Sequence, residues 1–202
     1  MSAHPSMAGY AEEAETLIRN YERHSFEEIF ADILHLFPDR PCRALDIGAG
    51  TGRHAAALAR RGHAVVAVEP TKELREAGQR LHTDVPLTWI DDALPELAKL
   101  QAPPLDGPYG LILMAAVLMH FDADERPALV ARCGNMLAPG GRFVLSLRNG
   151  PIPAGRRMFP VPREEIVALA DEHGMTCVGH AESADHSGRP GVSWTLVCFE
   201  KN

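Results

Sequence analysis

The stretch ALDIGAGTG at residues 44–52 decides the fold of this chain. Its apolar residues are typical of a buried parallel strand, and Asp46 stands near the carboxyl end of that strand. Three glycines follow on alternate positions, so the backbone can turn tightly and approach a ligand without an intervening Cβ atom. A helix expected at 51–61 directs its first N–H groups toward the same place. The stretch therefore predicts a strand, a ligand-facing turn and a helix.

The spacing of these glycines separates the nucleotide-binding folds that share such a turn. The dinucleotide fingerprint of NAD-binding folds requires a third glycine three residues after the second. Arg53 occupies that position, and its bulky cationic side chain weakens the NAD interpretation. The acid-x-Gly-x-Gly-x-Gly run instead resembles motif I of the class I S-adenosylmethionine-dependent methyltransferases, whose four positions are filled by Asp46, Gly48, Gly50 and Gly52.

Length and composition predict one globular unit. The chain has 202 residues, of which 46% are hydrophobic and 23% charged, and these values suit a single domain with a sizeable core. A second full domain would not fit comfortably. We expect one methyltransferase-like domain over 1–202, made of a helical N-terminal cap at 1–40 and a Rossmann-like core at 41–202.

Charge and cysteine usage disfavour several classes of partner. The net charge is −7 without a run of Lys and Arg, so nothing indicates binding to nucleic acid. The first thirty residues lack the pattern of a signal peptide, and no segment reaches the ~18 apolar residues of a membrane span, so we expect a cytoplasmic protein that binds no membrane. The four cysteines are dispersed, which predicts free thiols and no metal site.

Two amphipathic segments precede the first strand. Apolar residues recur at helical spacing over 11–21 and over 26–37, which predicts two leading helices. Ser25 followed by Glu28 is a capping box that marks the start of the second helix. Pro38 ends that helix before the first strand begins.

Beyond the glycine turn, segments typical of strands and helices alternate. We expect strands at 64–69, 86–90, 109–115 and 142–148, separated by helices at 71–81, 92–100 and 123–137. Such alternation predicts right-handed crossovers and a parallel sheet with helices on both faces.

The last quarter of the chain departs from this alternation. A loop rich in Pro and Gly at 149–162 leads to a helix at 163–173, and two strand-like runs follow at 176–180 and 193–199. Strands joined without a crossover helix are antiparallel neighbours. The predicted fold is therefore a Rossmann-like α/β sheet of seven strands, mostly parallel with one antiparallel strand, and class I methyltransferases have this arrangement. The resemblance covers almost the whole chain.

The resemblance implies S-adenosylmethionine as cofactor and S-adenosylhomocysteine as product. It assigns the glycine turn to the amino-acid part of the cofactor, Glu69 to the ribose hydroxyls and Asp92 to the adenine amine. The aromatic Tyr21 of the leading segment resembles residues that cover the methionine end in many small methyltransferases. The expected cofactor-binding residues are Tyr21, Asp46, Gly48, Ala49, Gly50, Arg53, Glu69, Pro70, Asp91, Asp92, Ala93, Met114 and Ala115.

The acids in this set also have structural interpretations. Glu69 could be a solvated acid at a strand end, while Asp91 could cap the helix expected at 92–100. Asp92 with Ala93 aligns best with the Asp-Ala pair of the family, and so ranks ahead of Asp91.

On the acceptor side, His120 is the candidate for proton chemistry. A neutral imidazole can take a proton from an O–H, N–H or S–H acceptor as the methyl group arrives, and the alternative is a histidine that orders its loop. The small side chains of Ala115 and Ala116 leave space for an acceptor or reflect tight packing. Methyl transfer does not require a base when the approach is in line.

Polar residues end the strand expected at 142–148, at the edge where open α/β sheets bind ligands. Arg156 and Arg157 in the next loop form a cationic rim suited to an anionic acceptor, or are simply solvated. The expected substrate-side residues are Ala116, His120, Arg148 and Asn149.

The sequence thus favours an enzyme that methylates a small molecule. A non-catalytic subunit that binds S-adenosylmethionine or S-adenosylhomocysteine and regulates or scaffolds a partner is the main alternative, and an NAD-dependent oxidoreductase is a remote one. The acceptor, the atom that receives the methyl group and the oligomeric state stay open.

Overall fold

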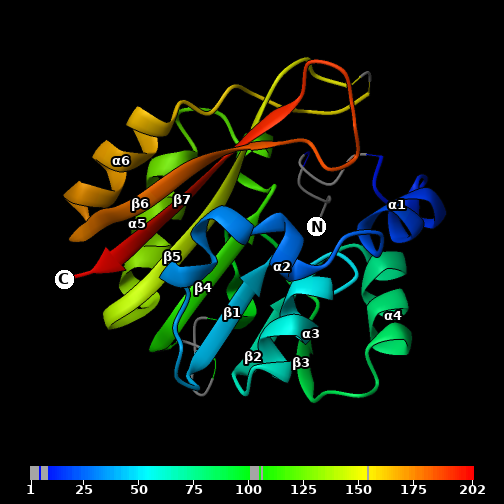
Figure 1. Cartoon of the computed structure of the whole chain (residues 1–202), viewed down its shortest axis with the longest axis horizontal. Coiled ribbons are helices and arrows are strands. Elements are labelled where there is room, and N and C mark those ends of the chain that lie inside the picture. Colours follow the sequence, from blue (N-terminus) through cyan, green and yellow to red (C-terminus); the bar gives the residue numbers. More distant parts are fainter. Residues whose placement is uncertain (1–4, 6–8, 101–104, 106, 154) are drawn as a thin grey trace.

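The computed structural model describes residues 5, 9–100, 105, 107–153 and 155–202. Its centre is a sheet built from β1 (Arg43–Ile47), β2 (Ala64–Val68), β3 (Leu87–Ile90), β4 (Tyr109–Ala115), β5 (Leu137–Asn149), β6 (Met175–Ala184) and β7 (Ser193–Lys201). The strand order is β3-β2-β1-β4-β5-β7-β6 (Figure 1). β1 to β5 run parallel, whereas β7 is antiparallel to both β5 and β6. The predicted sheet, with its one reversed strand, is confirmed.

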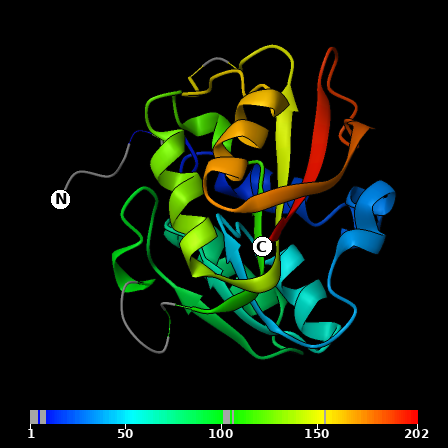
Figure 2. The same cartoon turned by 90° about the vertical axis from the view of Figure 1, so that its left-hand side faces the viewer.

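Helices cover both faces of this sheet. The α-helices are α1 (Ala14–Tyr21), α2 (Phe26–Ile29), α3 (Arg53–Arg60), α4 (Lys72–Leu81), α5 (Arg126–Met136) and α6 (Arg163–Glu172), and the three-ten helices are η2 (Ala31–Leu36), η3 (Ala98–Leu100) and η4 (Leu118–His120). α2 and α3 lie on one face, while α5 and α6 lie next to each other on the opposite face (Figures 1 and 2). Among the described residues, no helix has the length and apolar character needed to cross a membrane.

The second leading helix is broken, contrary to the prediction of one helix over 26–37. The capping box is present, since the Glu28 N–H donates to Ser25 Oγ at 3.1 Å. However, α2 ends at Ile29 and the chain continues as η2. The rings of Phe26, Phe30 and Phe37 lie 5.0–5.2 Å apart in a buried cluster. Packing of these rings on the sheet therefore outweighs the periodicity of a regular α-helix.

The prediction of a helix at 92–100 is also wrong. This segment forms turns and only the short η3. The Asp92 carboxylate accepts from the N–H groups of Ala93 and Lys99 at 2.9 and 2.7 Å. A side chain that bonds nearby N–H groups competes with the helical ladder, and Pro95 has no N–H to contribute to it.

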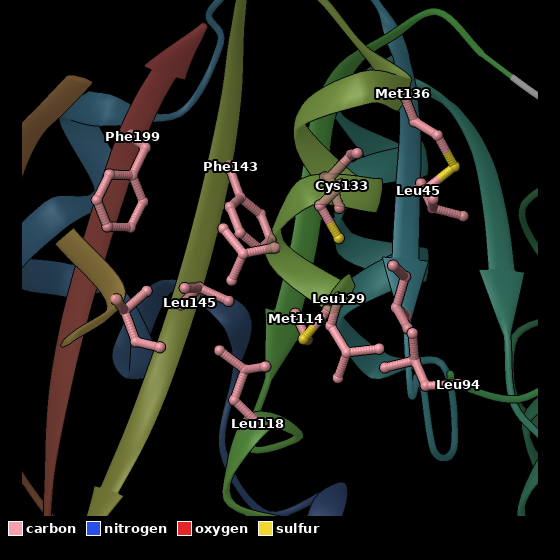
Figure 3. Packing of buried hydrophobic residues seen from close by; sticks show 14 of the residues in the cluster. Leu45, Leu94, Met114, Leu118, Leu129, Cys133, Met136, Phe143, Leu145 and Phe199 are labelled. Carbon is pink, nitrogen blue, oxygen red and sulfur yellow. The ribbon is translucent and has the colours of Figure 1, made fainter. Parts of the chain in front are cut away.

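The two faces of the sheet pack into separate clusters of buried side chains. In Figure 3, Leu129, Cys133 and Met136 lie on α5 beside the strands that carry Met114 and Phe143. The other cluster joins α2, η2 and α3 to the opposite face. Because both faces are covered, the strands are held firmly, and their carboxyl ends present loops in fixed positions.

Candidate active site

A cavity of about 540 Å³ opens at the carboxyl ends of the parallel strands. It lies where the strand order reverses between β1 and β4, the place where open α/β sheets bind ligands. Its volume is in the range of small-molecule and cofactor sites. The predicted site residues that line it are Tyr21, Gly48, Ala49, Gly50, Arg53, Glu69, Pro70, Asp92, Ala93, Ala115, Ala116, His120 and Arg148.

The glycine turn forms one wall of the cavity. The N–H groups of Gly48 and Ala49 both donate to the Val68 carbonyl at 2.9 Å, which fixes the turn against β2. Gly50 has a φ of +59°, and a Cβ atom there would lie 3.2 Å from the Tyr21 ring. The left-handed backbone and the close ring both require glycine at this position.

Glu69 lies at the end of β2 and is buried, with 5% of its surface exposed. Its two carboxylate oxygens accept from the N–H groups of Gly50 at 2.8 Å and Thr71 at 2.7 Å. Burial raises the pKa of this carboxyl group, while the N–H bonds act in the opposite direction. The solvated alternative is therefore wrong. Each oxygen has a second lone pair, so the carboxylate can still accept from a ligand.

Asp46 lies behind the glycine turn and does not line the cavity. Its carboxylate accepts from the N–H of Ala55 in the first turn of α3, and its Oδ2 has no partner among the described residues. Burial, followed by the negative charge of Glu69, raises the pKa of Asp46 to about 7. The position indicates that Asp46 supports the turn and the start of α3 from below.

The two acids after β3 lie in different surroundings. Asp91 pairs with Arg75 at 3.1 Å and does not line the cavity. The capping interpretation of Asp91 is wrong, because no α-helix follows it. Asp92 lines the cavity and orders its loop through the two N–H bonds described above. Its contact with adenine stays a prediction.

Arg53 joins the glycine turn to the N-terminal segment. Its guanidinium donates to the carbonyls of Tyr21 and His24, the latter at 2.9 Å. The residue that departs from the dinucleotide fingerprint therefore fastens the chain segment that covers the turn.

Two segments that are distant in the sequence meet over the cavity. We call them the roof: residues 9–24, and residues 150–153 with 155–160. Arg156 pairs with Glu13 at 2.7 Å, and its guanidinium carbon lies 4.1 Å from the centroid of the Tyr10 ring. These contacts join the two segments over the cavity.

The two arginines of the predicted cationic rim, Arg156 and Arg157, both form ion pairs with carboxylates. Arg156 is buried and paired with Glu13, so the solvated alternative is wrong for this residue. Arg157 pairs with Asp122 at 3.1 Å and with Glu125 at 2.9 Å. Both guanidinium groups are therefore matched by carboxylates of the chain itself.

His120 is buried, and both nitrogens of its ring are engaged. Its Nδ1 lies 2.9 Å from the Arg157 carbonyl, which can only accept, so Nδ1 carries the proton. Nε2 then accepts from the Tyr10 hydroxyl at 2.8 Å. Burial, and then the nearby positive charges of Arg156 and Arg157, lower the pKa of His120, although the bond to the Arg157 carbonyl opposes them. The imidazole is neutral at pH 7, and Tyr10 occupies its basic nitrogen.

The remaining predicted residues have packing roles. Met114 is fully buried under the sheet (Figure 3), and the Asn149 amide donates to Thr195 Oγ1 at 3.0 Å. Neither lines the cavity. The Ala116 N–H donates to Ser146 Oγ at 2.9 Å, which holds the small residues against β5.

Several cavity residues were not predicted. Tyr10 and Thr71 are among them, and so are Asp185 and Arg189 from the connection between β6 and β7, together with Trp194 at the start of β7. Asp185 accepts from Arg189 Nε and from Trp194 Nε1, both at 3.0 Å. The sequence carries no motif in this connection, and only the antiparallel return of β7 brings it to the cavity. Within the described ranges, no group of three or more His, Cys, Asp or Glu side chains is placed to hold a metal ion.

Known proteins resemble this chain in sequence and in structure. A family model for a methyltransferase domain matches residues 44–141. The ubiquinone biosynthesis O-methyltransferase of Xylella fastidiosa (strain M23) is 31% identical over 115 residues, which cover 55% of this chain and 44% of that protein. The matched region thus spans about half the length of the curated relatives.

Solved structures show the same fold. The magnesium protoporphyrin IX methyltransferase of Synechocystis PCC 6803, crystallised with S-adenosylmethionine, aligns with a TM-score of 0.65 and 14% identity over 96% of this chain and 80% of that chain. The 1,6-didemethyltoxoflavin-N1-methyltransferase of Burkholderia thailandensis, crystallised with 1,6-didemethyltoxoflavin and S-adenosylhomocysteine, aligns with a TM-score of 0.63 and 21% identity over 100% of this chain and 92% of that chain.

The sheet order and the glycine turn beside the cavity define a Rossmann-like α/β domain. The acid-x-Gly-x-Gly-x-Gly motif and the matched domain are more specific. Residues 44–141 match a methyltransferase domain, and the chain has the motif and the fold of the class I S-adenosylmethionine-dependent methyltransferases.

Proposed function

We propose that this protein transfers a methyl group from S-adenosylmethionine to a small-molecule acceptor. The observation that carries the proposal is one cavity that brings together the glycine turn, Glu69 and Asp92 beneath a roof of the chain's own residues. The solved structures with this fold include enzymes named for small molecules, magnesium protoporphyrin IX and 1,6-didemethyltoxoflavin. We also propose that the chain works as one domain in the cytoplasm, where its four unpaired thiols suit a reducing compartment.

The chain offers a distinct group for each part of the cofactor. The glycine turn leaves room for the amino-acid part, Glu69 supplies a carboxylate for the ribose hydroxyls, and the loop ordered by Asp92 faces the adenine. When bound, the cofactor supplies a methyl group on a positively charged sulfur. The chain contributes alignment of the acceptor with that methyl group and exclusion of water by the roof.

Two measurements test this proposal together. Calorimetry with S-adenosylhomocysteine tests the cofactor site, and a metabolite panel with labelled S-adenosylmethionine tests methyl transfer. Binding together with transfer is expected. Binding without transfer to any acceptor would favour the non-catalytic subunit, and binding of NAD instead of S-adenosylhomocysteine would favour the oxidoreductase.

Glu69→Gln is expected to weaken S-adenosylhomocysteine binding by about 10- to 100-fold, because hydrogen bonds to a charged acceptor contribute about 1.5–3 kcal/mol. Its raised pKa adds a pH effect. The affinity of the wild type should fall as the pH drops through that raised value, since a protonated carboxyl accepts less well, and the Gln variant should lack this dependence. Calorimetry across the pH range measures both effects.

The control for this variant is Glu73→Gln, which removes an exposed acid on α4 and should leave binding unchanged. Equal affinity of Glu69→Gln and wild type would place the ribose elsewhere.

His120 is expected to act by positioning Tyr10. With both ring nitrogens engaged, His120→Ala and Tyr10→Phe should each lower kcat by up to about 10-fold, the effect of one lost hydrogen bond. The double variant should resemble the single ones, since both remove the same contact. The dependence of kcat on pH, measured from pH 5 to 9, should have the same shape in these variants as in the wild type.

A loss of about 10²- to 10⁴-fold in His120→Ala, with disappearance of an acidic limb near pH 6–7, would instead identify His120 as the general base.

A further inference from the structure

Arg148 lies near the end of β5, at the boundary between two cavities. It lines the main cavity and also a second cavity of about 330 Å³ formed by the loop after β5. Met119 and Met158 line both cavities as well, so the two spaces adjoin at these three side chains. The other residues of the second cavity are Gly150, Pro151, Ile152, Phe159 and Pro160. Its wall is therefore largely apolar.

The guanidinium of Arg148 is buried and poorly compensated. The residue is 7% exposed, yet among the described residues its guanidinium has one hydrogen bond, to the Gly150 carbonyl at a long 3.3 Å. Its Nε is buried without a partner, and no carboxylate of the described chain lies within ion-pair distance of it. Burial, and next the positive charge of Arg189, lower the pKa of Arg148, although an arginine stays protonated.

Two of the other arginines that line the main cavity differ from Arg148 in this respect. Arg156 is paired with Glu13, and Arg189 is paired with Asp185. Asp185 is the nearby acid that opposes the shift of Arg148, and its oxygens already accept from Arg189 and Trp194. Arg148 therefore lines both cavities as a buried cation without a carboxylate partner among the described residues. A buried charge without a counter-ion is costly.

We infer that the methyl acceptor carries a carboxylate that pairs with Arg148. This inference rests on the proposed function and names the substrate class of the same site. A guanidinium offers parallel N–H donors that match the two oxygens of a carboxylate. Arg156 and Arg189 are already paired with carboxylates, and Arg53 donates to the carbonyls of Tyr21 and His24. The single guanidinium of Arg148 therefore suits a monoanionic group better than a phosphate dianion, which would need further cations. The apolar second cavity suits an acceptor with an aromatic or aliphatic body beside its carboxylate.

The test uses matched pairs of probes on the protein loaded with S-adenosylhomocysteine. Benzoate and phenylacetate are compared with benzamide and phenylacetamide by ligand-observed NMR titration, and phenyl phosphate is included as a third anion. The variants are Arg148→Gln, which removes the positive charge, and Arg148→Lys, which keeps the charge but lacks the parallel N–H donors of a guanidinium. Arg40→Gln is the control, because Arg40 is an exposed arginine that does not line the cavity.

The carboxylates should bind the wild type and Arg40→Gln, and the amides should bind at least about 10-fold more weakly. Arg148→Gln should lower carboxylate affinity by about 10- to 100-fold, with Arg148→Lys in between. Calorimetry of S-adenosylhomocysteine on each variant separates this result from the proposed function, since the cofactor should bind normally to Arg148→Gln.

Three results would overturn the inference while leaving the proposed function standing: no carboxylate binds the wild type, carboxylates bind Arg148→Gln equally well, or only phenyl phosphate binds. Loss of S-adenosylhomocysteine binding by the wild type would reject the proposed function itself. Among acceptors found by the labelled panel, conversion of a carboxylate to its amide should raise KM more than it lowers kcat.

Discussion

Gly50→Val is expected to weaken S-adenosylhomocysteine binding by at least about 100-fold, or ~2.7 kcal/mol. Two causes act together. The φ of +59° at Gly50 is costly for a residue with a Cβ atom, at roughly 1–2 kcal/mol. The valine methyl groups would also enter the space between the turn and the Tyr21 ring, only 3.2 Å from the new Cβ. Calorimetry on the purified variant measures the loss.

Gly140→Val is the matched control for this variant. Gly140 has a similar φ of +72°, but a Cβ atom there meets nothing within 4 Å. It therefore reports the cost of backbone strain without blocking the cavity. Equal affinity of Gly50→Val and Gly140→Val for the cofactor product would show that the glycine turn is not the binding wall.

Arg126→Ala is expected to lower the free energy of unfolding by about 3–5 kcal/mol, the range for removing one partner of a buried ion pair. Arg126 is 2% exposed and makes a two-point contact with Glu165 of α6 at 2.9 Å. It also donates to the carbonyls of Phe121 and Pro160 at 3.0 and 2.8 Å. One side chain thus ties α5, α6 and the loop after β5 together. Urea unfolding measures the change.

The comparison for Arg126→Ala is Arg60→Ala, which breaks an ion pair with Asp84 at 2.8 Å on the surface. Both partners are about half exposed, so the loss should stay below about 1 kcal/mol. If the two variants lost similar stability, the Arg126 cluster would contribute no more than a surface pair.

Much of the fold could be predicted because the periods of hydrophobic residues are set by local geometry. The strand-like segments of the sequence located all seven strands, although β6 and β7 extend beyond the ranges expected at 176–180 and 193–199. The failures have tertiary or side-chain causes. Burial of three phenylalanine rings broke the helix expected at 26–37, and the hydrogen bonds of Asp92 replaced the helix expected at 92–100.

The site residues that could be predicted are those at the ends of the parallel strands. The glycine turn, Glu69 and Arg148 each end or follow a parallel strand, so a correct strand order brings them together. Asp46 of β1 and Met114 of β4 do not line the cavity, whereas the residues that follow them, Ile47 and Ala115, do. Successive side chains of a strand point to opposite faces, so a difference of one residue decides this. Tyr10 and the Asp185–Arg189 pair reach the site only through packing between segments distant in sequence, which no local pattern encodes.

The hydrogen bonds from Arg53 to the N-terminal segment link ligand binding in the cavity to the docking of that segment. The guanidinium that flanks the turn also holds the carbonyls of Tyr21 and His24, and the Tyr21 ring faces Gly50. A ligand that binds the docked segment more tightly than the undocked one must favour docking by the same factor, because such coupling is reciprocal. Tyr10 belongs to the same segment. A first ligand that orders this segment therefore lowers the conformational entropy cost of binding a second ligand.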